Sequence, residues 1–383
     1  MANMGADGSD SGWYGDVVPI AQAIARSGAR VDFLAMSCYG RGTGNRYSLG
    51  TAYRCSERLQ SMRALGGEAW ASLPAQAMEY GLQQNAEGIV DEDPGVFGAA
   101  WQLATSTVHA RLGVERGFQW HFGELAFAYD QPNGPCSTAI SSTPCSLYAG
   151  TAWVTAQASL LFGNTTADCI NATVLEASEP GSNATQRGVS ADGIGGWSTA
   201  ETALMNQNGS EHSTTKSELR LLLVAFSPKT KTEDGDVVNV SVSFDMPVDW
   251  RAHSLQVRTA TLDRASSPFD AIWREGYANG WLTNSSDANV YPLSLSVMKM
   301  LTTAGKDALV QQKGAHFLEM QRQAFASTEW RDAHISTAGT TAGGETATVE
   351  CDSDGHGCEV LVSMAPPSVC ALWVRRAGAA SAL

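Results

Sequence analysis

Hydrophobic and polar positions in the first 163 residues follow two alternating patterns. Apolar residues recur at helical spacing in four stretches, at 12–28, 51–67, 94–113 and 147–163. Short apolar runs, typical of strands buried on both faces of a parallel sheet, lie between them at 29–40, 73–81 and 116–127. This order of helices and strands predicts a βα-barrel or a doubly wound sheet.

The pattern changes in the second half of the chain. From 164 to 216 the sequence is rich in Ser, Thr, Gly and Asn and has no clear period, which indicates a linker or an elaborated loop. Strand-like alternation then occupies 218–227, 236–246, 254–263, 345–352, 358–365 and 368–376. A helix-like stretch from Pro292 to Thr303 interrupts these strands. We predict a β-sandwich over 217–376 and a tail at 377–383.

Composition narrows the possible partners. The 383 residues carry a net charge of −14 and contain 43% hydrophobic residues, so a folded, acidic protein is expected. Nucleic acid and anionic membrane surfaces bind concentrated Lys and Arg, and no basic stripe is visible, so neither is an expected partner. No apolar run reaches the ~20 residues of a membrane-spanning helix.

Two features favour a secreted or lysosomal location. Six N-x-S/T sequons occur, at Asn164, Asn171, Asn183, Asn208, Asn239 and Asn284. The cysteines at 136 and 145 bracket one loop-like stretch, and those at 351 and 358 bracket another, so both pairs are predicted as local disulfides. Neither pair has the spacing or the histidines of a zinc site, and no metal is expected. A secretory signal would lie outside the printed sequence.

The strand at 31–40 carries a family resemblance. VDFLAMSCYG resembles the D-F-I-S-x-H-x-Y-G strand of glycoside hydrolase family 39, the β-xylosidases and α-L-iduronidase. Asp32, Phe33, Tyr39 and Gly40 match, and Ser37 stands where the family has histidine. The segment LPAQAMEYG is similar to the family's next strand, whose glutamate is the nucleophile.

Later segments extend the resemblance over most of the chain. The stretch 91–108 resembles the following helix of the family, and RGFQWHFGELAFAYD resembles strand eight of the barrel. In the second half, Asp263, Trp273 and Gly276 match a segment of the family's sandwich domain, and the final strands are similar too. The resemblance implies that 1–163 is the C-terminal part of a (β/α)8 TIM barrel, about strands five to eight, followed by the β-sandwich.

The function implied is hydrolysis of xyloside-like or uronide-like O-glycosidic bonds with retention, without a cofactor, and the chain is expected to be inactive as an isolated fragment. Glu79 is the implied nucleophile, with Tyr39 hydrogen-bonded to its carboxylate and Trp120 beneath the sugar. The residues expected to bind substrate are Tyr39, Ser37, Tyr80, Trp120, His121 and Glu124. The acid/base glutamate of strand four is expected outside the printed sequence, in the missing half of the barrel, and Glu124 is the residue here that could partly replace it.

Plainer interpretations stay open beside these. Glu79 could be a solvated carboxylate at a strand end. Glu92 is the other candidate for the nucleophile, and we interpret it as part of a solvated acidic loop and helix cap. Trp120 and His121 could lie on the two faces of an ordinary strand. The alternative function is a noncatalytic carbohydrate-binding or structural secreted glycoprotein derived from a glycosidase.

Overall fold

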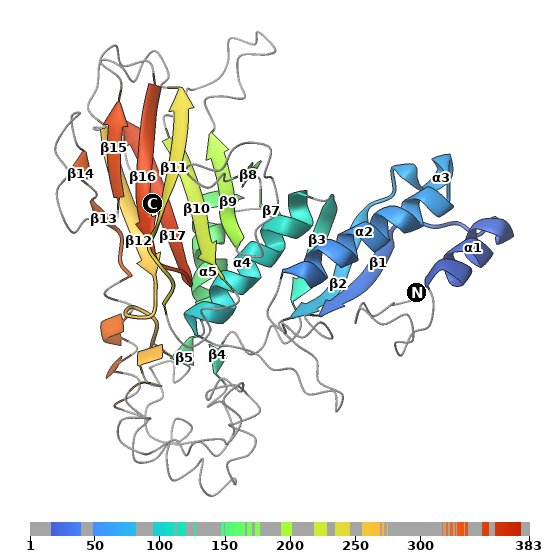
Figure 1. Cartoon of the computed structure of the whole chain (residues 1–383), viewed down its shortest axis with the longest axis horizontal. Coiled ribbons are helices and arrows are strands. Elements are labelled where there is room, and N and C mark those ends of the chain that lie inside the picture. Colours follow the sequence, from blue (N-terminus) through green and yellow to red (C-terminus); the bar gives the residue numbers. More distant parts are fainter. Residues whose placement is uncertain are drawn as a thin grey trace, which may run out of the picture.

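The structure is a computed structural model of the whole chain, drawn in Figure 1. It describes residues 17–39, 49–81, 95–111, 113–119, 126–127, 147–148, 150–164, 167–170, 173–176, 193–200, 218–227, 234–245, 255–268, 270–271, 274, 316, 319–320, 322–324, 326, 328–332, 334–335, 347–351 and 357–376.

The first part of the chain alternates helices and strands as the sequence predicts. The elements are α1 (Val17–Ser27), β1 (Leu34–Tyr39), α2 (Gly50–Leu65), α3 (Glu68–Ala71), β2 (Ala75–Gly81), α4 (Val96–Arg111), β3 (Val114–Gln119) and α5 (Gly150–Phe162). Strands β1, β2 and β3 form a three-stranded parallel sheet in that order. This curled sheet with its helices is consistent with part of a (β/α) barrel.

Short strand pairs follow the parallel sheet. They are β4 (Ala126–Phe127) with β5 (Leu147–Tyr148), and β6 (Gly163–Asn164) with β7 (Ala167–Ile170).

Two further sheets form the second part of the molecule. The six-stranded sheet has the order β13-β12-β17-β10-β9-β8 and the four-stranded sheet the order β11-β16-β15-β14. Their strands are β8 (Thr173–Glu176), β9 (Gly193–Ala200), β10 (Glu218–Phe226), β11 (Val238–Asp245), β12 (Leu255–Leu262), β13 (Arg331–Asp332), β14 (His334–Ile335), β15 (Ala347–Cys351), β16 (Gly357–Met364) and β17 (Ser368–Arg376). The strand-like alternation of the sequence is thus confirmed as largely antiparallel sheets.

One expectation about this region needs correction. Strands β8 and β9 lie within 164–216, the stretch interpreted as a linker or loop, and β9 pairs with β10 along its length. The Gly-rich β9 lacks the apolar alternation that marks a strand, but its backbone still completes the ladder. The helix expected from Pro292 to Thr303 lies outside the described residues.

The six-stranded sheet separates two hydrophobic cores. On β17, Cys370, Leu372 and Val374 belong to the core between the two sheets. Val369 and Ala371, which alternate with them, belong to the core that also contains the helices and the parallel sheet. The sandwich and the helical layer therefore share one packed interface.

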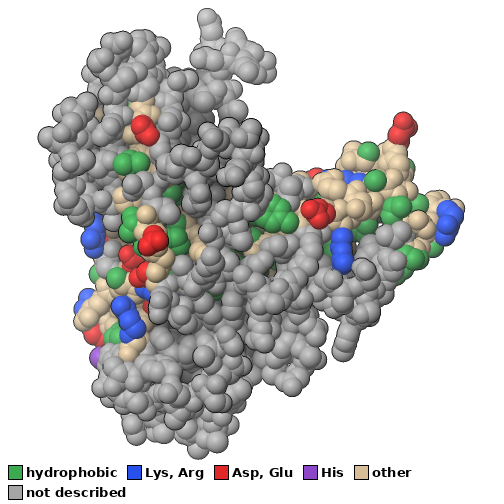
Figure 2. Space-filling view, in the orientation of Figure 1, with side chains coloured by type: hydrophobic (Ala, Val, Ile, Leu, Met, Phe, Trp, Pro, Cys, Tyr) green, Lys and Arg blue, Asp and Glu red, His purple; other side chains and the backbone are tan. Residues whose placement is uncertain are grey.

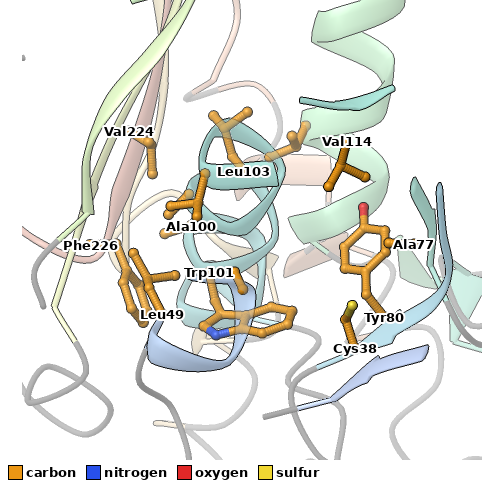
Figure 3. Close-up of a cluster of buried hydrophobic side chains, with 14 of the residues drawn as sticks. Cys38, Leu49, Ala77, Tyr80, Ala100, Trp101, Leu103, Val114, Val224 and Phe226 are labelled. Carbon is orange, nitrogen blue, oxygen red and sulfur yellow. The ribbon is translucent and has the colours of Figure 1, made fainter. Parts of the chain in front are cut away.

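Helix α4 lies within that interface, between the parallel sheet and the six-stranded sheet (Figure 1). Phe97 of α4 and Phe226 of β10 are both fully buried, with ring centroids 5.1 Å apart. Figure 3 shows Trp101, Ala100 and Leu103 of the same helix between Val224 and Phe226 on one side and Tyr80 on the other. A helix covered on opposite sides has little need for a polar face, which explains why its sequence is apolar or neutral nearly all round.

The cysteines differ in part from the prediction. Cys38 of β1 and Cys55 of α2 form a disulfide, with a Cα–Cα distance of 5.9 Å. Cys358 is also disulfide-bonded, and Cys351 lies directly opposite it in the β15–β16 register, which agrees with the predicted local pair. The other predicted pair, Cys136 with Cys145, lies outside the described residues. The thiol of Cys370 is free and buried, and burial raises its pKa to about 11.

On the face seen in Figure 2, the described acidic and basic side chains are interspersed. One example of an exposed ion pair is Arg30 with Asp32, whose Nε and Oδ1 atoms are 2.7 Å apart. None of the helices in the described part of the chain has the length and apolar character to cross a membrane.

Candidate functional site

The carboxyl ends of the parallel strands bring several of the expected site residues together. In the β1–β2 register, Ser37 lies opposite Glu79, Cys38 opposite Tyr80, and Tyr39 opposite Gly81. The register shifts between Met36 and Ser37, just before these residues. Since active sites of parallel βα folds form at the carboxyl ends of strands, this edge is the candidate site.

The remaining expected residues fall just beyond the described strands. Trp120 follows Gln119, the last residue of β3, and His121 and Glu124 come after it, all three outside the described residues. Gln119 itself is the register partner of Tyr80 in β2.

Ser37 occupies a closed position. Its relative exposure is 3%, and it stands at the point where the family resemblance expects a histidine. A small hydroxyl side chain here fits the packed layer between the strand and its neighbours. Ser37 is accordingly placed in the core rather than on an open surface.

Tyr80 lies between the sheet and helix α4, and its expected role in substrate binding stays a prediction. Its side chain is 6% exposed, and its hydroxyl oxygen is 3.3 Å from Oγ of Ser106. Its ring meets His109 edge-on at 5.7 Å between centroids. Burial raises the pKa of Tyr80, so it stays a neutral phenol.

Neighbouring strands are shaped around this tyrosine. A Cβ atom at Gly117 of β3 would lie 3.1 Å from Cε1 of Tyr80, so the glycine leaves room for the ring. Trp101 of α4 also contacts it, at 6.5 Å between ring centroids. Tyr80 thus ties the end of β2 to both β3 and α4, directly beside Glu79 in the sequence.

His109 is a buried ionisable residue that the sequence reasoning did not single out. It is 3% exposed, and its Nε2 atom has no hydrogen-bond partner among the described residues. Burial lowers its pKa from 6.5 to about 4, so the imidazole is neutral at physiological pH. The only signal in the sequence was a histidine inside an apolar helix, a pattern that is usually structural.

The described residues contain no group of three or more His, Cys, Asp and Glu side chains that could hold a metal ion. The strand end that carries Glu79 in its backbone is packed through the neighbouring Tyr80, whose ring contacts Trp101 and His109 of the buried helix α4.

The proteins that resemble this chain are solved structures with a similar fold and low sequence identity. No family model and no curated protein matches the sequence. Among solved structures, the family 39 glycoside hydrolase from Xanthomonas axonopodis pv. citri aligns with 98% of this chain at 10% identity and a TM-score of 0.48. A bacterial orthologue of human α-L-iduronidase aligns with 95% at 10% identity and a TM-score of 0.45. A glucosidase from Croceicoccus marinus aligns with 94% at 10% identity and a TM-score of 0.40.

These neighbours are glycoside hydrolases, and each is longer than this chain. The aligned part spans 60%, 54% and 57% of their respective lengths. Likeness at this level assigns the chain to no family.

Proposed function

We propose that this chain is the nucleophile-bearing part of a retaining glycoside hydrolase that acts on xyloside-like or uronide-like O-glycosidic bonds. The observation that carries the proposal is the place of Glu79, at the carboxyl end of the central strand of the parallel sheet and opposite Ser37 of β1. The sequence resemblance of both strands to family 39 assigns the nucleophile to the same residue.

The proposed reaction has two steps. The carboxylate of Glu79 attacks the anomeric carbon, the glycosidic C–O bond breaks, and the leaving oxygen takes a proton from a second carboxylic acid. Water then attacks the glycosyl ester, gives its proton back to that second group, and frees Glu79. In retaining enzymes the two carboxyl groups are about 5 to 5.5 Å apart.

Other residues have proposed roles around this carboxylate. Tyr39 donates a hydrogen bond that keeps Glu79 ionised, and Trp120 provides an apolar face for the sugar. His121 and Glu124 lie close enough in sequence to Trp120 to contact the same ligand. The second carboxylic acid belongs to a further barrel strand, with Glu124 as the candidate inside this chain.

The experiment that tests Glu79 uses an activated donor. A 2-deoxy-2-fluoro-glycosyl fluoride releases fluoride without help from an acid, so the nucleophile can be tested in the 383-residue chain alone. We expect a xylosyl or iduronosyl donor to add one fluoroglycosyl unit to the peptide that contains Glu79, measured by mass spectrometry after digestion.

Two variants give the controls. Glu79→Gln removes the nucleophile and abolishes the label. Glu115→Gln changes an exposed glutamate near the start of β3, at the opposite end of the strand, and leaves the labelling rate unchanged. Labelling at another residue, or no labelling with either donor, contradicts the proposal.

A noncatalytic, secreted carbohydrate-binding or structural glycoprotein is the second candidate. The observation in its favour is the buried Ser37 at the position of the expected histidine, because it removes a polar group that could reach a ligand. This candidate predicts saturable binding of xylo- or uronate oligosaccharides in calorimetry together with no covalent label on Glu79. It also predicts glycans on sequons such as Asn239 of β11 when the protein passes through the secretory pathway.

A further inference from the structure

Helix α4 begins without a capping side chain of its own. The carbonyl of Gly95 accepts the first helical hydrogen bond, from the amide of Ala99 at 3.2 Å, so Gly95 is the N-cap residue. A glycine has no side chain that could accept hydrogen bonds from the amides of the first turn. Val96 and Phe97 are completely buried, which keeps water from taking that place.

The missing acceptor comes from the sandwich segment. The amide of Val96 donates to Oδ2 of Asp270 at 2.9 Å, across 174 residues of sequence. Asp270 is 3% exposed, so the bond is shielded from solvent. A carboxylate at this end also complements the positive end of the helix dipole.

Asp270 is itself held by charge and by a tight turn. Nη1 of Arg264 lies 3.1 Å from Oδ1 of Asp270, and Nε of Arg264 lies 2.9 Å from Oδ1 of Asp234. The turn that follows β12 is closed by the amide of Ser267 donating to the carbonyl of Asp263 at 2.8 Å. The carboxylate is therefore fixed relative to the six-stranded sheet.

Helix α4 connects the fixed carboxylate of Asp270 to strand β2. The helix supplies Trp101, Ser106 and His109, the residues that surround the Tyr80 ring. A shift of the helix would move the pocket that holds Tyr80, and Tyr80 is the residue next to Glu79. Close packing makes such a layer move as a unit.

We propose that Asp270 is a positioning residue for the carboxyl end of β2, acting through the N-terminus of α4. That this strand end is a glycosidase site rests on the proposed function. The structural coupling of Asp270 to β2 does not depend on that proposal. A residue of the sandwich segment thus helps to position the strand end that carries Glu79, although the two are far apart in sequence.

Hydrogen exchange in the 383-residue chain, read by mass spectrometry, tests the coupling. Asp270→Ala should raise exchange about tenfold or more at the start of α4 and in β2, because a buried charge-assisted hydrogen bond is lost. Exchange in β11 and β16, which pair on the far side of the sandwich, should stay unchanged. Asp270→Asn keeps an acceptor oxygen without the charge and should give an intermediate increase; it also serves if the alanine variant fails to fold.

Asp234→Asn is the matched control. It neutralises the second carboxylate that pairs with Arg264, that of Asp234, whose side chain is 55% exposed. The hydrogen bond from Val96 to Asp270 is left in place. We expect wild-type exchange in β2 for this variant. Unchanged β2 exchange in both Asp270 variants, or an equal rise in β11 and β16, would overturn the coupling.

The rate of fluoroglycosyl labelling at Glu79 provides the functional readout. Asp270→Ala should slow labelling about tenfold at saturating donor, Asp270→Asn should recover part of the rate, and Asp234→Asn should match the wild type. Equal labelling rates in wild type and Asp270→Ala would overturn the positioning role. If the wild type is not labelled at all, the proposed function fails, while the exchange data still decide whether Asp270 controls β2.

Discussion

The sandwich and the parallel layer are stabilised in different ways. Each central strand of the six-stranded sheet places alternate residues into two separate cores, and long antiparallel registers fix its position. The three parallel strands have no second sheet among the described residues, and they are held by helices and by the Cys38–Cys55 disulfide. The parallel layer therefore depends on α4, which the sandwich also buries, and its stability is tied to that of the sandwich.

The largest expected effect is the loss of the aromatic contact between the two regions. Phe97→Ala removes a fully buried ring that touches Phe226 and should lower the free energy of unfolding by about 3 to 5 kcal/mol. Chemical denaturation measures this loss, and hydrogen exchange should rise in both the parallel sheet and β10. Phe118→Ala, at a ring that is 47% exposed, is the control and should cost less than about 0.5 kcal/mol.

Acid should weaken the parallel layer through His109. Burial lowers its pKa from the ordinary 6.5 to about 4 in the folded protein, so the unfolded chain binds the proton first as the pH falls. The contribution of neutral His109 to the free energy of unfolding is fully present well above pH 6.5. It falls by about 3 kcal/mol by pH 4. Unfolding curves measured from pH 7 to pH 4 should show a shallower decline in His109→Gln than in the wild type. An identical slope in His109→Gln would show that the decline has another source.

Removing the Cys38–Cys55 disulfide should destabilise the parallel layer and not the sandwich. The Cys38→Ala, Cys55→Ala double variant opens a link between residues 17 apart and should cost about 2 to 3 kcal/mol. Faster hydrogen exchange should be confined to β1 and α2. Cys370→Ala also removes a buried sulfur but cuts no cross-link, so a smaller effect, located in the sandwich, is expected there.

The smallest expected effect is at the surface of the parallel layer. Arg30 and Asp32 form an ion pair with side-chain exposures of 87% and 61%. Because solvent screens such pairs, Asp32→Asn should change the free energy of unfolding by less than about 0.5 kcal/mol. A larger loss in denaturant unfolding would mean that Asp32 has a role that its exposed pairing does not explain.

Local patterns in the sequence were sufficient to predict most of the elements. The apolar spacing before Gly28 predicted α1, and the glycine takes a positive φ of 68° just after the helix ends. The apolar run ending in Glu79 and Tyr80 predicted β2, and the alternation in SVCALWVRR predicted β17. These features are set by neighbours within a few residues, so a single sequence can reveal them.

Features that depend on contacts between distant segments were not predictable in this way. The Cys38–Cys55 bond requires α2 to pack on β1, and the cap on Val96 requires a residue that follows β12. The position of Tyr80 depends on α4, which the strand pattern alone cannot place on either face. For the candidate site, the apolar run was enough to predict the strand end that carries Glu79, whereas the packing of Tyr80 against α4 is a tertiary contact that no local pattern reveals. The functional roles of all the expected site residues stay predictions: Glu79, Tyr39, Ser37, Tyr80, Trp120, His121 and Glu124.

The bond between Val96 and Asp270 also sets an order for biosynthesis. The ribosome makes α4 first and must add 174 more residues before the carboxylate exists. At about 5 to 20 residues per second, the nascent helix waits roughly 9 to 35 s for its cap. Strands β8 to β12 are made within that interval, so part of the sheet surface that covers α4 is synthesised before the residue that caps the helix.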